Sequence, residues 1–446
     1  MKNTVFLAVP NYVFATDLLR TRYIEYLASK YRVIVLTPFL GQNKADQYYQ
    51  SADTVYVQRQ LENPKFWSVF KFLRICWVNE FDYLASAQHF YKRPNYKNNW
   101  KRRLFRTIGL PFSRFLTVNF FTAIEAMVLP NSVFFRSLIK QYRPKLVITA
   151  TPGFDPWEAE IILLSKRLGL STVAVNFSWD NLTMNSKHIR KADFLIPWNG
   201  IMKHEAETIH NYPENQVFVS GTPRFDPYFK KEESEPTRAD FIKSKGLDPK
   251  YPTVLYTTVT KAYPFQKKYI YDLIELRKKK VIPYVNIFVR LHPLDLPGNY
   301  TEFTGLPNFY IEMAGREVVP GRVEMNYQDL LNLKYSLKYT DLNINYASTI
   351  SIEACIFDKP IINIGYLGVY ALAYDFDHYR PIYQSGAIRL VKIDDDLPKL
   401  ISLYLESPKL DSGHRKKIVD RYVEFIDGLS YKRSVDLLER CFLSQK

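Results

Sequence analysis

Residues 345–364 read NYASTISIEACIFDKPIINI, and this stretch indicates the fold class. It starts at the end of Leu342–Asn345, where apolar and polar residues alternate as in a strand. Small polar residues and a stretch predicted to be helical follow, and an apolar run occupies Ile361–Ile364. A strand, a helix and another strand in this order form the unit from which parallel sheets are built. We therefore predict an α/β protein.

The same alternation of short apolar runs and amphipathic stretches continues along the 446 residues. That length is too great for one ordinary domain. The polar segment KKEESEP at 230–236 has the composition of a linker. We predict a first domain over 1–228, a linker over 229–250, a second domain over 251–410, and a helical tail over 411–446 that crosses back onto the first domain.

Several protein classes are disfavoured by what the sequence lacks. Three scattered cysteines, Cys76, Cys355 and Cys441, do not form a disulfide framework or a multi-cysteine zinc site, so a reducing cytoplasm is the simplest compartment. No run of about 18 apolar residues predicts a membrane span. The absence of P-loop, GxGxxG, HExxH, GxSxG and CxxC motifs disfavours ATPases, simple dehydrogenases, zinc proteases and serine hydrolases.

The net charge of +16 is concentrated in residues 65–115, where eleven bases face two acids. Aromatic residues are interleaved with these bases, and such a mixture suits an anionic membrane surface or a nucleic acid. No RNA- or DNA-binding signature accompanies it, so we expect no nucleic-acid partner. The alternative is the solvated basic face of an ordinary helical region.

The loop after Asn345 has the residue types of a phosphate site. Ser348 and Thr349 offer hydroxyl donors where a helix begins, and free N–H groups at that end favour an anion. Glu353, about one turn later, is placed to accept hydrogen bonds from a ribose diol. The alternative is an ordinary N-cap at Ser348 or Thr349, with Glu353 closing a capping box.

A second signal is VRLHP at 289–293, which places His292 just beyond a buried strand, where ligands of parallel sheets bind. His292 is predicted to donate to a phosphate oxygen, although a histidine at such a position can also be structural. Arg290 and Tyr346 lie in these two segments, Thr258 follows the predicted strand Thr253–Thr257, and the three complete the predicted donor-binding set. Two such signals in one α/β domain favour a nucleotide site.

The VRLHP and NYASTISIEACIFDKPIINI segments resemble the donor-binding half of GT-B glycosyltransferases, and the RPHP and DYSS motifs of CDP-glycerol glycerophosphotransferases. They are also similar to the UDP-N-acetylglucosamine 2-epimerase group. The resemblance implies two Rossmann-like domains whose parallel sheets face each other across a cleft, with a nucleotide donor in the second. It also implies that His292, Ser348 and Thr349 contact donor phosphates, that Glu353 contacts the ribose, and that no metal or other cofactor is required.

The first domain departs from the glycerophosphotransferase pattern. A His-Gly dipeptide is expected near its end, but residues 176–183 read NFSWDNLT, which leaves the histidine proposed as the base of that family without a counterpart. This segment resembles SWDNLT stretches of bacterial surface-polysaccharide glycosyltransferases, which favours sugar transfer.

An inverting transfer needs a base for the acceptor hydroxyl. The candidates are Asp180, Asp155 and Asp17, each following a predicted strand; the alternative for each is a helix cap or a loop hydrogen bond. Trp179 is predicted to stack on a sugar ring, flanked by Ser178 and Asn181 as acceptor-binding residues. A retaining mechanism remains open.

Arg224 and Lys261 are further cationic candidates, with a plain surface charge as the alternative. Asp375-Phe376-Asp377 and Asp394-Asp395-Asp396 have the spacing of metal-binding DxD motifs, but we predict no metal.

The sequence as a whole is interpreted as a GT-B glycosyltransferase. It would move a sugar from a nucleotide-sugar donor to a glycan or lipid-linked acceptor of capsule, O-antigen or lipooligosaccharide, as a cytoplasmic protein bound to the inner face of the membrane. The alternatives are a CDP-linked polyol-phosphate transferase, a nucleotide-sugar epimerase and a non-enzymatic nucleic-acid-binding protein.

Overall fold

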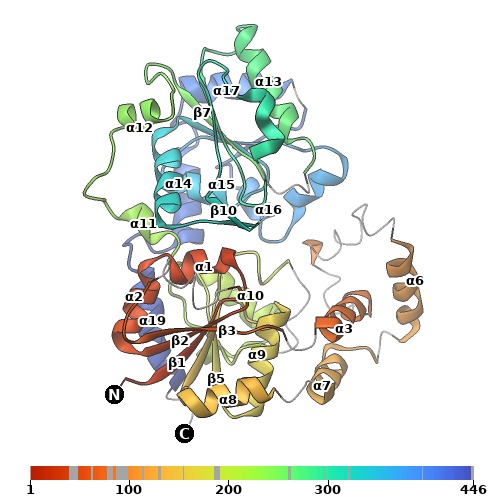
Figure 1. Ribbon diagram of the computed structural model, residues 1–446. Coiled ribbons are helices and arrows are strands. Elements are labelled where there is room, and N and C mark those ends of the chain that lie inside the picture. Colours follow the sequence, from red (N-terminus) through yellow and green to blue (C-terminus); the bar gives the residue numbers. More distant parts are fainter. Residues whose placement is uncertain are drawn as a thin grey trace. The chain divides into compact units, whose positions relative to one another are not determined.

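The computed structural model describes residues 2–39, 49–61, 64–77, 84–86, 99–112, 115–128, 132–153, 155–184, 191–259, 263–295, 297–319, 322–393 and 395–442. The chain divides into two units (Figure 1). Unit 1 comprises Met1–Arg224, Phe376–His378 and Leu429–Lys446, and unit 2 comprises Phe225–Asp375 and Tyr379–Gly428.

Unit 1 contains a parallel six-stranded sheet in the order β3-β2-β1-β4-β5-β6. Its strands are β1 (Thr4–Ala8), β2 (Arg32–Thr37), β3 (Thr54–Gln58), β4 (Leu146–Thr149), β5 (Ser171–Val175) and β6 (Phe194–Ile196). This is the strand order of a Rossmann fold, whose direction of winding reverses between β1 and β4.

Helices cover both faces of this sheet because its strands are apolar on both sides. Val5 and Val33 pack with α1, α2 and α19, whereas Phe6 and Ile34 pack with α8 and α9 (Figure 1). The helices of unit 1 are α1 (Tyr12–Leu19), α2 (Arg22–Lys30), α3 (Pro64–Trp77), α6 (Trp100–Gly109), η2 (Leu110–Phe112), α7 (Val118–Val128), α8 (Val133–Tyr142), α9 (Pro156–Arg167), α10 (Gly200–His210), η3 (Glu214–Gln216) and α19 (Ser430–Phe442).

The helix α19 joins the carboxyl end of the chain to unit 1. Tyr431, Val435, Leu438 and Cys441 recur at helical spacing and enter the core beside β1 and β2. The predicted return of the tail is therefore confirmed for α19, whereas the preceding helix α18 (Ser412–Ile418) belongs to unit 2.

Unit 2 repeats the same winding, with a parallel sheet in the order β14-β13-β12-β7-β8-β9. Its strands are β7 (Thr253–Thr257), β8 (Asn286–Arg290), β9 (Phe309–Glu312), β12 (Leu342–Asn345), β13 (Ile361–Asn363) and β14 (Arg389–Leu390), with a separate antiparallel pair, β10 (Arg316–Val319) and β11 (Arg322–Glu324). The predicted fold, two Rossmann-like α/β domains, is confirmed.

The helices of unit 2 surround this sheet. They are α11 (Asp226–Phe229), α12 (Arg238–Ser244), α13 (Gln266–Lys278), η4 (Pro297–Phe303), α14 (Tyr327–Tyr339), α15 (Ile350–Ile356), η5 (Gly368–Asp375), α16 (Arg380–Tyr383), α17 (Asp396–Glu406), α18 and η6 (Val419–Val423).

The segment predicted as a linker, 229–250, is largely part of unit 2. Phe241 of α12 is buried, and its ring lies 5.7 Å from the ring of Tyr339 and 6.4 Å from that of Phe288. The polar residues 230–236 predict a linker, but the buried side chain of Phe241, five residues later, packs the segment onto unit 2.

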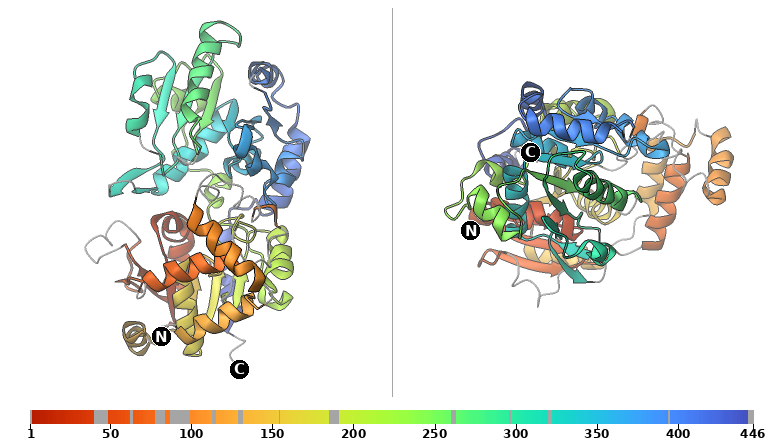
Figure 2. Two further views of the ribbon diagram at one scale, coloured as in Figure 1. Left: turned by 90° about the vertical axis from the view of Figure 1, so that its right-hand side faces the viewer. Right: turned by 90° about the horizontal axis from the view of Figure 1, so that it is seen from above.

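The described part of the basic, aromatic segment forms α3, α6 and η2, with α7 following. The views of Figures 1 and 2 place α3, α6 and α7 beside the sheet of unit 1 rather than over one of its faces. Trp100, Leu104 and Ile108 of α6 are 66%, 47% and 51% exposed. Within the ranges that the structure describes, no helix is both long and apolar enough to cross a bilayer.

Candidate functional site

The predicted donor-binding residues of unit 2 follow three neighbouring strands. Thr258 follows β7, His292 follows β8, and Tyr346 with Ser348 follows β12. The strand order reverses between β7 and β12, and ligands of such sheets bind outside the carboxyl ends of the strands at that point. Parallel pairing thus brings to one edge residues that lie about 90 positions apart in the sequence.

His292 is held as a neutral imidazole. Its backbone N–H donates to Thr258 Oγ1 at 2.9 Å, and its Nδ1 accepts from the N–H of Leu294 at 3.0 Å. Burial lowers the pKa of His292 to about 4, against a smaller opposing effect of the Asp295 carboxylate. Because Nδ1 is an acceptor, the proton of the neutral ring lies on Nε2, which is therefore a donor for an anion.

Asp295, which is 4% exposed, stabilises the loop that carries His292 through hydrogen bonds. Its Oδ2 accepts from Thr258 Oγ1 at 3.2 Å and from the Tyr300 hydroxyl at 2.5 Å. The Thr258 hydroxyl, predicted to bind donor, thus connects His292 to Asp295 in this structure.

The predicted phosphate loop begins with Ala347, whose φ of 36° is left-handed. Ser348 Oγ accepts from the N–H of Ile350 at 3.3 Å, and Thr349 is the residue before α15. Glu353 does not close a capping box there. Its carboxylate is 3% exposed and accepts the hydroxyl of Tyr228, so the alternative proposed for Glu353 from the sequence does not describe this helix.

Arg290 is occupied by buried partners within unit 2. Its guanidinium is buried, pairs with the Glu312 carboxylate and donates to the carbonyl of Asp329 at 3.2 Å. These contacts explain the cation inside a sheet, because an ion pair offsets part of its desolvation. A donor-binding role for Arg290 stays a prediction.

Tyr346 belongs to an aromatic group beside the loop. Its ring stacks on Tyr263 at 4.4 Å and 13°, and its hydroxyl donates to the carbonyl of Tyr370 at 2.6 Å. Gly365 makes this stack possible: at its φ of 80° a Cβ would lie 2.7 Å from both Tyr263 Oη and Tyr346 Cδ2.

In unit 1, two of the predicted bases have structural partners. Asp17 is buried and pairs with Arg224 Nε at 2.9 Å; burial raises its pKa, and Arg224 opposes that effect. Asp155 caps α9 by accepting from the N–H groups of Trp157 at 2.9 Å and Glu158 at 3.4 Å. For Asp155 the helix-cap alternative describes the structure, and catalysis by Asp17 or Asp155 stays a prediction.

Asp180 lies in a polar group that includes a histidine absent from the sequence-based predictions. Thr183 Oγ1 lies 3.0 Å from Nδ1 of His378, and the indole of Trp179 meets the imidazole edge-on at 4.8 Å. Burial lowers the pKa of His378, whereas the charges of Asp180 and Asp377 act in the opposite direction. His378 lies almost 200 residues from Asp180, and no local motif links the two.

Further acids surround this group. Asp377 accepts from the N–H of Ser86 at 3.1 Å, and Glu205 of α10 has its pKa raised to about 8 by burial and by the charges of Asp377 and Asp180. Such a shift keeps Glu205 mostly protonated at neutral pH. Asp180, Asp377, Glu205 and His378 therefore interact electrostatically in unit 1, and we call these four residues the Asp180 cluster.

The three predicted acceptor-binding residues shape the loop before the Asp180 cluster. Trp179 is 5% exposed and its ring contacts that of His378, so the stacking of Trp179 on a sugar stays a prediction. The hydroxyl of Ser178 donates to Asp180, and Asn181 donates to Asn176 Oδ1 at 3.3 Å. Lys261 and Asp394 lie outside the described residues. Among the residues that are described, no three His, Cys, Asp or Glu side chains are grouped to hold a metal ion.

The family of the chain follows from a comparison over all of unit 2 and part of unit 1. Residues 162–440 match the model of the CDP-glycerol:poly(glycerophosphate) glycerophosphotransferase family. The chain belongs to this family. The glycerophosphotransferase match spans His292, the segment Ser348–Glu353 and the Asp180 cluster. No curated protein matches the sequence.

Solved structures show the same fold at low identity. The wall teichoic acid polymerase TagF, as a variant soaked with CDPG, is 12% identical with a TM-score of 0.53, over 100% of this chain and 90% of that chain. S. aureus MnaA with UDP is 12% identical with a TM-score of 0.55, over 100% and 98% of the two chains. UDP-GlcNAc 2-epimerase from Neisseria meningitidis, bound to UDP-GlcNAc, is 11% identical with a TM-score of 0.55, over 98% and 100%. The family match and these structures together show a transferase family with a GT-B-like fold. The matching family is the one from which the polyol-phosphate alternative was drawn.

Proposed function

We propose that this protein transfers a polyol phosphate from a CDP-linked donor to a hydroxyl group of a growing surface polymer. The observation that carries this proposal is the family match, which spans both candidate sites. It replaces sugar transfer as the first choice, because the family is described as a glycerophosphotransferase and the residues predicted to bind phosphate follow neighbouring strands of unit 2.

Donor binding is assigned to the carboxyl edge of the unit 2 sheet. The Nε2–H of His292 donates to a phosphate oxygen of the donor, and the N–H groups near Ser348 and Thr349 supply further donors. A neutral imidazole suits this task. Its N–H stabilises the charge that develops on the leaving nucleotide, and the ring keeps that proton at neutral pH.

Acceptor activation is assigned to the Asp180 cluster of unit 1. The acceptor oxygen forms a bond to the phosphorus that bears the polyol, the bond from that phosphorus to the nucleotide oxygen breaks, and CMP leaves. The hydroxyl proton passes to a base, for which Asp180 and His378 are the candidates. His378 provides in this chain an imidazole that the NFSWDNLT segment itself lacks.

Sugar transfer from a nucleotide-sugar donor to a glycan or lipid-linked acceptor is the second candidate. The resemblance of Ser178–Thr183 to surface-polysaccharide glycosyltransferases favours it, and the same donor site would hold the diphosphate of a nucleotide sugar. Nucleotide-sugar epimerases share the fold, but the family match favours group transfer.

We also propose attachment to the inner face of the cytoplasmic membrane through α6. Trp100, Leu104 and Ile108 recur at helical spacing and are exposed, and Lys101 and Arg103 flank them. An exposed apolar stripe beside bases is the arrangement of helices that lie in an anionic membrane interface. Extraction tests it: release of the protein from bacterial membranes by high salt supports electrostatic attachment, and retention in salt with release by detergent supports apolar insertion.

The donor is tested by thermal stabilisation with CMP, CDP, UDP, GDP and ADP. We expect stabilisation by CDP and a smaller stabilisation in His292→Ala. Transfer assays then compare CDP-glycerol with nucleotide sugars, and release of CMP that depends on an acceptor identifies polyol-phosphate transfer. Release of a nucleoside diphosphate from a nucleotide sugar instead would reject it in favour of the second candidate.

A further inference from the structure

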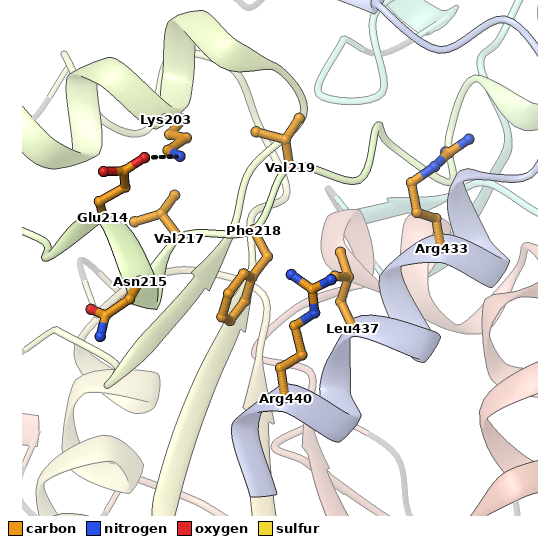
Figure 3. A pocket seen from close by; sticks show the side chains of 9 residues that line it. All are labelled: Lys203, Glu214, Asn215, Val217, Phe218, Val219, Arg433, Leu437 and Arg440. Atoms are coloured by element: carbon orange, nitrogen blue, oxygen red, sulfur yellow. Dashed lines mark hydrogen bonds and ion pairs between the residues drawn. The ribbon is translucent and has the colours of Figure 1, made fainter. Parts of the chain in front are cut away.

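A groove of about 850 Å³ lies on unit 1 and has no part in the sites described above (Figure 3). One wall is the face of α19 that carries Arg433, Leu437 and Arg440. The other side is formed by the segment Val217–Val219 and by Lys203 of α10. All of these elements belong to unit 1.

The floor of the groove is the outer edge of the sheet. Phe218 N–H donates to the carbonyl of Leu195 at 2.9 Å, and Ser220 N–H donates to that of Pro197 at 3.2 Å, so this segment extends the sheet beyond β6. Because N–H groups alternate along an extended chain, that of Val219 points away from β6. Within the described part of the chain, the edge beyond Val219 carries no further strand.

The helix α19 has three faces with different partners. One face, already described, enters the core. A second carries Asp436 and Glu439, whose carboxylates pair with Lys30 at 2.5 and 3.3 Å. The third carries Arg433 and Arg440, which are seven residues apart, while both acids of the helix form ion pairs with Lys30. The groove therefore keeps a positive charge that the sequence of α19 alone does not reveal.

The two arginines are oriented by contacts that leave the groove cationic. Arg433 Nη1 donates to the carbonyl of Ser220 at 2.8 Å, and the guanidinium of Arg440 lies over the ring of Phe218 at 5.5 Å. Lys203 pairs with Glu214 at 3.3 Å, and these four side chains give the lining a net charge of +2. At 1.5 Å per residue the arginines are about 10 Å apart along the helix, too far for one small anion to bridge.

We propose that this groove binds an extended chain of phosphate groups, namely the polyol-phosphate polymer that is lengthened in the proposed function, on which this inference rests. Arginine suits phosphodiesters because its planar fork of N–H donors matches phosphate oxygens. The apolar floor of Phe218 and Leu437 accommodates the CH₂ groups between phosphates. Arg433 donates to the carbonyl of Ser220, which follows the carboxyl end of the segment Val217–Val219. Asp180 likewise lies beyond the carboxyl end of a strand, β5. A chain that runs from Arg440 to Arg433 is thus directed toward the edge where acceptor hydroxyls would react.

The test measures binding of a long and a short glycerol phosphate oligomer to the full chain by fluorescence anisotropy. We expect the long oligomer, which spans both arginines, to bind more tightly than the short one. The variant Arg433→Gln/Arg440→Gln should weaken the long oligomer about tenfold or more and abolish the length dependence. Lys432→Gln is the matched control, because Lys432 lies on the same helix but pairs with Asp436 at 2.7 Å on another face, and it should change binding less than twofold.

Unchanged binding in the double variant overturns the proposal. So does equal binding of an aspartate oligomer of the same charge with the same loss in the variant, because the groove would then suit an acidic protein segment. Stabilisation by CDP, measured on the same variants, separates this inference from the proposed function. If CDP stabilises the protein but the glycerol phosphate oligomers do not bind, the groove is wrongly assigned and the donor site stands. If no nucleotide binds, the proposed function fails, and the polymer assignment of the groove fails with it.

Discussion

Removal of the His292 side chain is the sharpest test of the donor site. His292→Ala deletes the neutral Nε2–H donor and leaves the backbone N–H that Thr258 accepts. A hydrogen bond to a charged group contributes about 1.5–3 kcal/mol, so the affinity for CDP should fall roughly 10- to 150-fold. The variant also removes Nδ1, which accepts from the N–H of Leu294, so the Tm of the apo variant is measured beside that of the parent.

The loss of affinity determines how far CDP raises the Tm of the variant. At a CDP concentration of 100 Kd, binding stabilises the folded protein by about 2.7 kcal/mol, and a 30-fold loss of affinity leaves about 0.9 kcal/mol. For a unit of about 200 residues, 1 kcal/mol corresponds to roughly 2–4 °C. The shift in Tm should therefore fall from about 5–11 °C to about 2–4 °C.

Differential scanning fluorimetry with and without CDP measures this shift. His204→Ala is the control, because His204 is an exposed histidine of α10 in unit 1 and should leave the shift unchanged. If His292→Ala keeps the full CDP shift while its apo Tm matches that of the parent, His292 does not contact the donor and the site has been placed wrongly.

Four other outcomes are expected. As the pH falls from 6.5 to about 4, the unfolded chain binds a proton that folded His292 does not, so stability to urea should decrease in that window, and the decrease should be smaller in His292→Gln. For Glu205 the sign is opposite, because its pKa in the folded protein is about 8, so stability should decrease as the pH rises from 4.5 to 8. Glu205→Gln should therefore be more stable than the parent at pH 8 but not at pH 5. An equal gain at both pH values would contradict the raised pKa of Glu205. Arg59→Met leaves the Glu160 carboxylate buried without its guanidinium and should cost about 3–5 kcal/mol in urea unfolding, most of it recovered in Arg59→Met/Glu160→Leu; no recovery would mean that the loss is one of packing. Tyr228→Phe removes the hydroxyl that Glu353 accepts, and should destabilise unit 2 by about 1–3 kcal/mol; an unchanged Tm would show that the carboxylate has other sufficient donors.

The candidate site could be predicted in part because its residues are adjacent to strands. His292 and Ser348 each follow a run of apolar residues that is buried on both faces, and the carboxyl ends of parallel strands meet at one edge. The Rossmann order of both sheets then places the loops after β7 and β12 at the reversal point. These are local signals, and each can be read within about twenty residues.

The roles of individual side chains were less accessible. Arg290 alternates with its neighbours on a strand, and only the sheet shows that Glu312 of β9 lies beside it to form a buried ion pair. Glu353 has the spacing of a capping box, yet Tyr228, 125 residues earlier, provides its donor. A side chain with two available partners takes the one that tertiary packing brings within reach, and the sequence does not record that distance.

The sequence by itself determined the α/β class and the loops that hold the donor-binding candidates, because periodicity and strand-end polarity depend on neighbours in the chain. The two Rossmann-like domains were implied by its resemblance to GT-B transferases. Only the tertiary structure decided that His378 lies beside Asp180 and Trp179, and that burial and neighbouring acids raise the pKa of Glu205. It also decided that α19 presents two arginines to a groove beside the sheet. These features depend on burial and on charges that are close in space but far apart in sequence, and both arise only when the chain is folded.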